Sequence, residues 1–73
     1  MALVDVPAPM TGTIKEVLCS VGDQIAVGHE VLVLESMKME IPVECPEEGR
    51  VAEVAIEAGQ HVEEGDLLLR LES

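Results

Sequence analysis

Short apolar segments alternate with glycine-centred turns along this chain. Residues 12–19 begin at a glycine and are rich in β-branched side chains, which predicts a strand, and the apolar run 31–34 predicts a second one. Residues 49–56 and 67–71 repeat these two strands later in the sequence. Glycine or proline interrupts every window of about ten residues, which disfavours helices. The pattern therefore predicts an all-β protein built from short strands.

The second half of the sequence is a copy of the first. Residues 9–36 align without gaps on residues 46–73, so that Gly12 matches Gly49, 37 positions later. Two copies indicate a domain with an internal pseudo-two-fold axis, because a solenoid requires at least about three repeats. Short strands at regular spacing favour a sandwich or a flattened barrel, which also closes the strand edges.

We predict that residues 1–73 form a single domain. Its two repeat halves span about residues 7–36 and 44–73. No Pro/Ala-rich linker is visible in the sequence, so we expect a free-standing chain.

Each half also breaks the strict alternation of a β-strand. Ile14 and Val17 are three positions apart, and their repeat partners Val51 and Val54 keep the same spacing. Side chains on one face of a regular strand are two positions apart, so we predict one β-bulge in each half.

A hairpin joins the two halves and presents a lysine at its tip. The strand 31–35 runs into Met37 and Lys38 and returns as residues 39–44. Two-residue hairpin turns favour glycine because their backbone needs positive φ angles, and the other turns of this chain contain glycine. A turn without glycine indicates a functional constraint. The equivalent position in the second half is the chain terminus, so the lysine and the termini should lie at opposite ends of the domain.

The charge and the aromatic content of the chain disfavour some classes of binding partner. The chain of 73 residues has a formal net charge of −11 and an aromatic fraction of 0%, which disfavours binding to nucleic acid. No apolar run approaches the ~18 residues of a membrane span, and no signal peptide is visible. We expect a cytoplasmic monomer whose cysteines are free thiols.

The cysteines and histidines do not predict a metal site. The spacing of Cys19, His29, Cys45 and His61 matches no familiar pattern of zinc ligands. The repeat partners of the cysteines are apolar and those of the histidines are polar turn residues. We therefore expect buried cysteines and histidines in turns. No set of nucleophile, base and orienting residue can be drawn either, so we expect no catalytic residue.

The segment Glu-Ser-Met-Lys-Met-Glu at residues 35–40 resembles the attachment site of biotin carboxyl carrier domains, in which a lysine lies between two methionines. Residues 7–12 and 46–51 are similar to two proline- and glycine-containing segments of that family. The similarity extends from about residue 6 to residue 71. On these residues the chain resembles the biotinyl/lipoyl carrier family, in particular the free-standing bacterial biotin/lipoyl attachment proteins.

This resemblance implies both a fold and a function. The family fold is a flattened antiparallel β-barrel of two four-stranded sheets, a barrel-sandwich hybrid. The implied function is that of a non-catalytic carrier whose covalent biotin is attached to Lys38. The residues Glu35, Ser36, Met37 and Met39 form the context that the modifying enzyme reads. The implied partners are biotin protein ligase, biotin carboxylase and carboxyltransferase, and the biotin shuttles a carboxyl group between the last two.

Ser36 departs from the biotin pattern, because many biotin domains have alanine or valine at this position. A Glu-Ser or Glu-Thr pair is common before the lysine motif of lipoyl domains, so Glu35 and Ser36 slightly favour lipoate as the cofactor. Met37 and Met39 favour biotin more strongly. A lipoyl carrier of a 2-oxoacid dehydrogenase or of lipoyl relay is one alternative, and an unmodified interaction module is another.

Attachment of a cofactor to Lys38 requires another protein. Only a neutral amine attacks an acyl group, and exposed lysines are almost entirely protonated at neutral pH. The sequence shows no evident base for Lys38. We therefore expect a separate ligase to activate the amine in its own active site.

Overall fold

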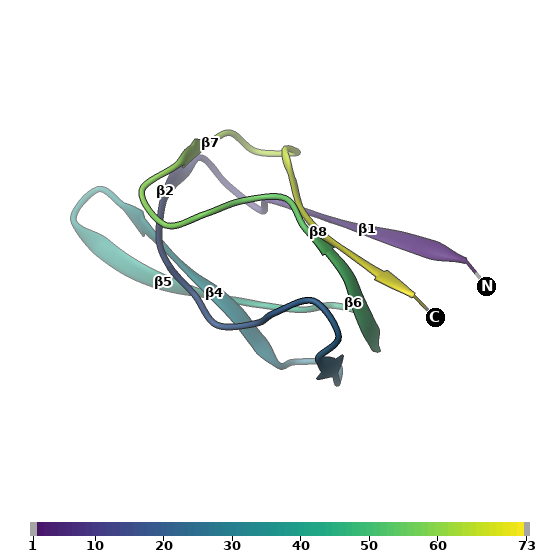
Figure 1. The fold of residues 1–73 in the computed structure, drawn as a ribbon. Coiled ribbons are helices and arrows are strands. Elements are labelled where there is room, and N and C mark those ends of the chain that lie inside the picture. Colours follow the sequence, from purple (N-terminus) through teal and green to yellow (C-terminus); the bar gives the residue numbers. More distant parts are fainter. Residues whose placement is uncertain (1, 73) are drawn as a thin grey trace.

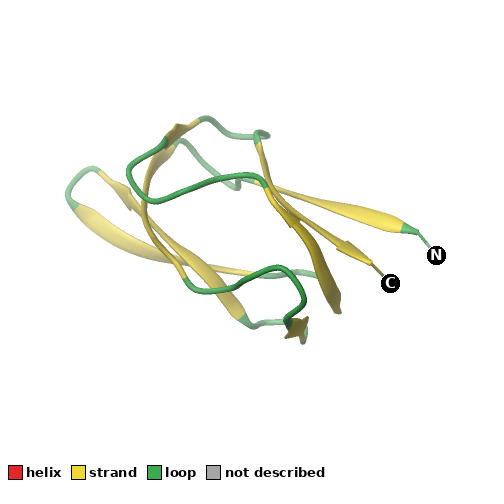
Figure 2. Cartoon of the chain, viewed as in Figure 1, coloured by secondary structure: helices red, strands yellow, loops and turns green. Residues whose placement is uncertain are grey.

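The computed structural model describes residues 2–72 and contains eight strands and no helix among them (Figures 1 and 2). One sheet has the strand order β1-β8-β6-β3 and the other β5-β4-β2-β7, and all pairings are antiparallel. The predicted fold class, two four-stranded sheets of a flattened barrel, is confirmed. The strands are β1 (Leu3–Pro7), β2 (Gly12–Val17), β3 (Gln24–Ile25), β4 (Glu30–Ser36), β5 (Met39–Glu44), β6 (Gly49–Val54), β7 (His61–Val62) and β8 (Leu67–Glu72).

The predicted domain limits include two residues, Met1 and Ser73, that lie outside the described part of the chain. Residues 2–72 contain no helix, and therefore no helix that could span a membrane.

The two sheets are copies of one another. Strands β2, β3 and β4 begin at residues 12, 24 and 30, and β6, β7 and β8 begin 37 positions later, at residues 49, 61 and 67. Replacing each strand of the order β1-β8-β6-β3 by its repeat partner gives β5-β4-β2-β7, the order of the other sheet. The repeat in the sequence is therefore a two-fold repeat of strands in space.

Both predicted bulges are present. The register between β2 and β4 shifts between Ile14 and Glu16, and the register between β6 and β8 shifts at the equivalent place, between Val51 and Glu53. The bulge lets both Ile14, which is fully buried, and Val17, which packs against the core, face the interior.

The predicted ends of two strands, residues 19 and 56, are wrong by two residues. Strand β2 ends at Val17 and β6 ends at Val54. The Leu18 N–H still donates to the Val31 carbonyl, but the chain then leaves the sheet and turns Cys19 into the core. Apolar residues continue past the end of each strand because they fill the end of the barrel. The pattern of apolar positions along the chain does not distinguish such residues from those of a strand.

Three of the eight strands were not located from the sequence. Strands β3 and β7 have two residues each and follow directly after glycine turns, so no periodicity in the sequence marks them. Strand β1 forms the edge of its sheet and pairs with β8. Its partner in the repeat is β5, so the offset of 37 residues was the signal that could have located it.

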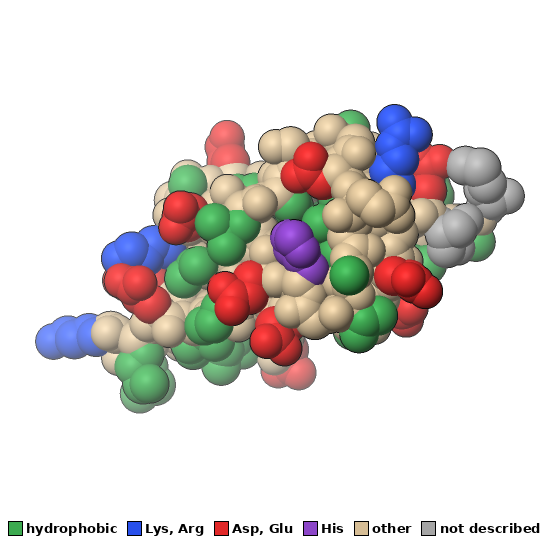
Figure 3. Space-filling model, turned by 90° about the horizontal axis from the view of Figure 1, so that it is seen from below, with side chains coloured by type: hydrophobic (Ala, Val, Ile, Leu, Met, Phe, Trp, Pro, Cys, Tyr) green, Lys and Arg blue, Asp and Glu red, His purple; other side chains and the backbone are tan. Residues whose placement is uncertain are grey.

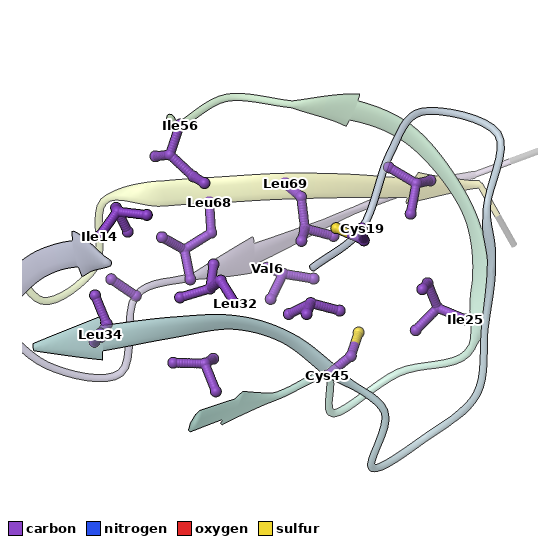
Figure 4. Packing of buried hydrophobic residues seen from close by; sticks show 14 of the residues in the cluster. Val6, Ile14, Cys19, Ile25, Leu32, Leu34, Cys45, Ile56, Leu68 and Leu69 are labelled. Carbon is purple, nitrogen blue, oxygen red and sulfur yellow. The ribbon is translucent and has the colours of Figure 1, made fainter. Parts of the chain in front are cut away.

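The core lies between the two sheets and consists of aliphatic side chains and two cysteines (Figure 4). No polar or charged side chain is buried among the described residues. Full burial of one leucine stabilises the fold by about 1.5–3 kcal/mol relative to its exposure. The fully buried residues include Ile14, Leu32, Leu34, Leu68, Leu69, Leu71, Val6, Val31, Val51, Val62 and Cys45.

The cysteines are free and buried, as predicted. Both histidines are exposed, and the prediction that they lie in turns is wrong for His61, which lies in strand β7. The described residues contain no group of three or more histidine, cysteine or acidic side chains that could hold a metal ion.

The domain is elongated, with principal extents of 38 × 18 × 17 Å. The β4–β5 hairpin lies at one end, and the start of β1 and the end of β8 lie at the other (Figure 1). The lysine turn is therefore separated, as predicted, from the first and last strands of the described chain.

Candidate functional site

The turn between β4 and β5 consists of Met37 and Lys38. The ladder closes with Ser36 opposite Met39, which leaves two residues in the turn. Their φ angles are 52° and 67°, and in the described chain they are the only residues other than glycine with positive φ. Two consecutive positive φ angles are typical of the type I′ hairpin turn. This conformation costs about 1–2 kcal/mol for each side chain that carries a Cβ, so the pairing of β4 with β5 must maintain it.

The turn projects its side chains into solvent. Met37 is 92% exposed and Met39 is 65% exposed, and Lys38 is also exposed. Figure 3 shows a basic side chain with hydrophobic side chains beside it at one narrow end of the molecule. Ser36, which lies just before the turn, is half-buried, and Glu35 is exposed. The structure thus places all five predicted site residues on one hairpin.

Lys38 has no hydrogen-bond or ion-pair partner among residues 2–72. No pocket is formed by the described residues either. The site therefore offers a free, exposed primary amine and no enclosure around it. Such an amine fits a cofactor held by a covalent amide, and it does not fit a cofactor held by a binding cavity.

The other lysine, Lys15, is in a different state. Its Nζ lies 2.7 Å from Glu40 Oε2 and 3.9 Å from Glu35 Oε2. The hydrogen bond from Lys15 to Glu40, followed by the charge of Glu40, raises the pKa of Lys15. The fraction of neutral, reactive amine at Lys15 is thereby lowered, so the two lysines are chemically distinct.

The contacts of Lys15 with Glu35 and Glu40 were not predicted from the sequence. Lys15 lies at the β-bulge of β2, where the register against β4 shifts. A bulge redirects side chains by an amount that the sequence does not give. One signal was present, since the repeat partner of Lys15 is Ala52 and the symmetry of the two halves is therefore broken at this position.

A model of the family described as "Biotin-requiring enzyme" matches residues 4–71. The chain is 50% identical over 62 residues to the biotin/lipoyl attachment protein of Bacillus subtilis, a match that covers 85% of each protein. It is 40% identical over 65 residues to the biotin carboxyl carrier protein of Streptococcus mutans, which covers 89% of this chain and 50% of that protein.

A solved structure supports the same relationship. A single-chain, multi-domain long-chain acyl-CoA carboxylase contains a region that superposes with a TM-score of 0.86 at 34% identity. The match covers 93% of this chain and 7% of the carboxylase. The chain therefore belongs to the family of biotin-requiring enzymes, the biotin/lipoyl attachment family.

Proposed function

We propose that this chain is a biotin carrier that is covalently modified on Lys38. The observation that carries the proposal is the free, exposed amine of Lys38 at the tip of the β4–β5 hairpin. The similarity to a biotin carboxyl carrier protein supports biotin as the group attached. The remaining lysine, Lys15, is bound by two glutamates and is a poorer acceptor.

Attachment forms an amide between Lys38 Nζ and the carboxyl carbon of biotin. The acyl group must arrive activated, for example as a mixed anhydride, because a carboxylate is a poor acyl donor. The neutral amine attacks the acyl carbon, the bond to the leaving group breaks, and the leaving group keeps the bonding electrons. The amine nitrogen gives its proton to a base of the modifying enzyme. We assign this step to a biotin protein ligase, since the described residues offer neither a pocket nor a base at Lys38.

The chain itself acts as a carrier and not as a catalyst. Attached biotin would hold a carboxyl group in transit between a biotin carboxylase site and a carboxyltransferase site. Acylation removes the positive charge of Lys38 and lengthens its side chain into a flexible tether. Met37 and Met39 offer adaptable apolar contacts on both sides of this tether, which suits recognition by more than one enzyme.

A lipoyl carrier is the second candidate. The relative from Bacillus subtilis is named for both cofactors, and Glu35 with Ser36 resembles the residues that precede the lysine of lipoyl domains. The same free amine would form the same kind of amide with lipoate.

Co-expression with a biotin ligase, and separately with a lipoyl ligase, tests both candidates. Intact mass and peptide mapping then report the group gained and the residue that carries it. We expect a gain of one biotin on Lys38, and no gain in Lys38→Arg, which should fold normally. A gain of lipoate alone would replace biotin by lipoate, and no gain with either ligase would leave an unmodified interaction module.

A further inference from the structure

Two carboxylates face each other at the base of the lysine hairpin. Glu35 of β4 and Glu40 of β5 are directly opposite in the ladder, one pair before the Ser36–Met39 pair that closes the turn. Like charges in this position repel and destabilise a hairpin. Both carboxylates are also within three residues of Lys38, so each is a candidate to pair with its amine.

Lys15 binds both of these carboxylates from the neighbouring strand. Its Nζ is 2.7 Å from Glu40 and 3.9 Å from Glu35, so one cation of β2 reaches across β4 to β5. With Lys15 in place, neither glutamate pairs with Lys38. The charged groups of Lys15, Glu35 and Glu40 are thereby paired with one another on the face of the sheet. The charge of Lys38 remains unpaired among residues 2–72, at the tip of the hairpin.

We propose that Lys15 is a positioning residue for Lys38: it holds the carboxylates of Glu35 and Glu40 over the sheet and so keeps the Lys38 amine unpaired for acylation. This inference rests on the proposed function and adds the ion pairs that keep the Lys38 amine accessible to a ligase. In the absence of Lys15, part of the population would pair Lys38 with one of the glutamates. A ligase would then bind only the molecules in which Lys38 is unpaired, and its apparent affinity would fall in proportion to their share of the population.

The repeat indicates that the fold does not need Lys15 at this position. Ala52, its repeat partner in β6, lies at the bulge of the other sheet without a charge. That sheet has an ion cluster elsewhere: Arg70 of β8 binds Asp5 of β1 and Glu53 of β6, each at 3.0 Å. Arg70 spans three strands as Lys15 does, but lies on the sheet that lacks the hairpin, so it provides a matched control.

Steady-state biotinylation by a biotin protein ligase with ATP and biotin tests the proposal at low ionic strength. For Lys15→Gln we expect KM for the carrier to rise about two- to fivefold with kcat unchanged, the range that a surface ion pair supplies. Lys15→Arg should behave as the wild type. Arg70→Gln, which changes the net charge equally, should leave KM unchanged. Adding Glu40→Gln to Lys15→Gln should restore much of the loss, which a merely structural defect would not allow.

A second measurement does not depend on any ligase. Acylation of the chain by an N-hydroxysuccinimide ester of biotin, followed by peptide mapping, reports the reactivity of each lysine. We expect Lys38 to react faster than Lys15 in the wild type, and Lys38 of Lys15→Gln to react about two- to fivefold more slowly.

These experiments separate the inference from the proposed function. An unmodified wild type in the ligase assay would refute the proposed function, while the chemical acylation would still decide the role of Lys15. Equal rates for the wild type and Lys15→Gln, or an equal defect in Arg70→Gln, would overturn the positioning role.

Discussion

Gly12 and Gly49 lie against the backbone carbonyl of a facing strand at the same point of the two-fold repeat. A Cβ on Gly12 would be 2.9 Å from the Glu35 carbonyl oxygen, and a Cβ on Gly49 would be 2.6 Å from the Glu72 carbonyl oxygen. Glu35 and Glu72 are themselves repeat partners. The close approach of two strands in each half therefore depends on glycine, and near the hairpin it brings β2 against the last residues of β4.

Substitution of these glycines should destabilise the fold. We expect Gly49→Ala to lower the free energy of unfolding by about 3 kcal/mol and Gly12→Ala by about 2 kcal/mol, because rigid backbone atoms must move to admit the methyl group. Chemical denaturation measures both values.

Gly65→Ala is the matched control for this prediction. Gly65 has a φ of 91° but no atom within 4 Å of the added Cβ, so only the backbone strain of about 1 kcal/mol remains. Equal losses for Gly65→Ala and Gly49→Ala would contradict the steric explanation.

Relief of the strained turn should stabilise the domain. Met37 has a φ of 52° and is 92% exposed, so Met37→Gly removes the strain and loses almost no packing. We expect a gain of about 0.5–1 kcal/mol in the free energy of unfolding. Met39→Gly should instead lose about 0.5–1 kcal/mol, since Met39 lies in strand β5. A loss of stability in Met37→Gly would show that the methionine side chain supports the turn.

Among residues 2–72, one of the four glycine turns lacks the side-chain hydrogen bond that its repeat partner has. Asp66 accepts a hydrogen bond from the Glu63 N–H at 2.9 Å, and His29 occupies the equivalent position in the first half. In both turns the backbone closes in the same way, from His29 N–H to the Ala26 carbonyl and from Asp66 N–H to the Glu63 carbonyl.

Replacing His29 by aspartate should therefore add the missing bond. We expect His29→Asp to raise the free energy of unfolding by about 0.5 kcal/mol, and Asp66→Ala to lower it by about 1 kcal/mol. Thermal unfolding monitored by circular dichroism is a sufficient measurement. A decrease for His29→Asp would indicate that added negative charge outweighs the new bond in this acidic domain.

The stability of the domain should fall at alkaline pH. Burial raises the pKa of the Cys19 thiol, and the charges of Asp23 and Cys45 raise it further. The folded state thus retains a proton that the unfolded chain loses near pH ~8.5. This contribution is fully present below that pH and is lost as the pH rises toward the pKa of the folded state.

Urea denaturation between about pH 7.5 and pH 9.5 measures this effect. The window lies below the range in which Lys15, whose pKa is also raised, loses its proton. Cys19→Val should be less dependent on pH than the wild type. An identical pH dependence of the two proteins would assign the effect to another group.

Much of the fold was predictable because the sequence contains it twice. The repeat located both bulges and the hairpin, and the family resemblance supplied the two four-stranded sheets. Strands β3 and β7 were missed because two residues carry no measurable periodicity. Lys38 stood out as a lysine in a turn without glycine, a local property of the chain. The role of Lys15 depends on three strands and a bulge, and a distance between strands is set by packing and not by spacing along the sequence.

Strands β1 and β8 lie side by side with Leu3 opposite Glu72, at the end of the barrel remote from Lys38. A polypeptide joined to either strand would therefore hold the domain by the same end. The folded body, 38 Å along its longest axis, would then act as a stiff extension between the joint and the Lys38 amine. Under the proposed function, a tethered copy of this fold would sweep its biotin through a volume enlarged by its own length, and one arm could then serve active sites that lie farther apart.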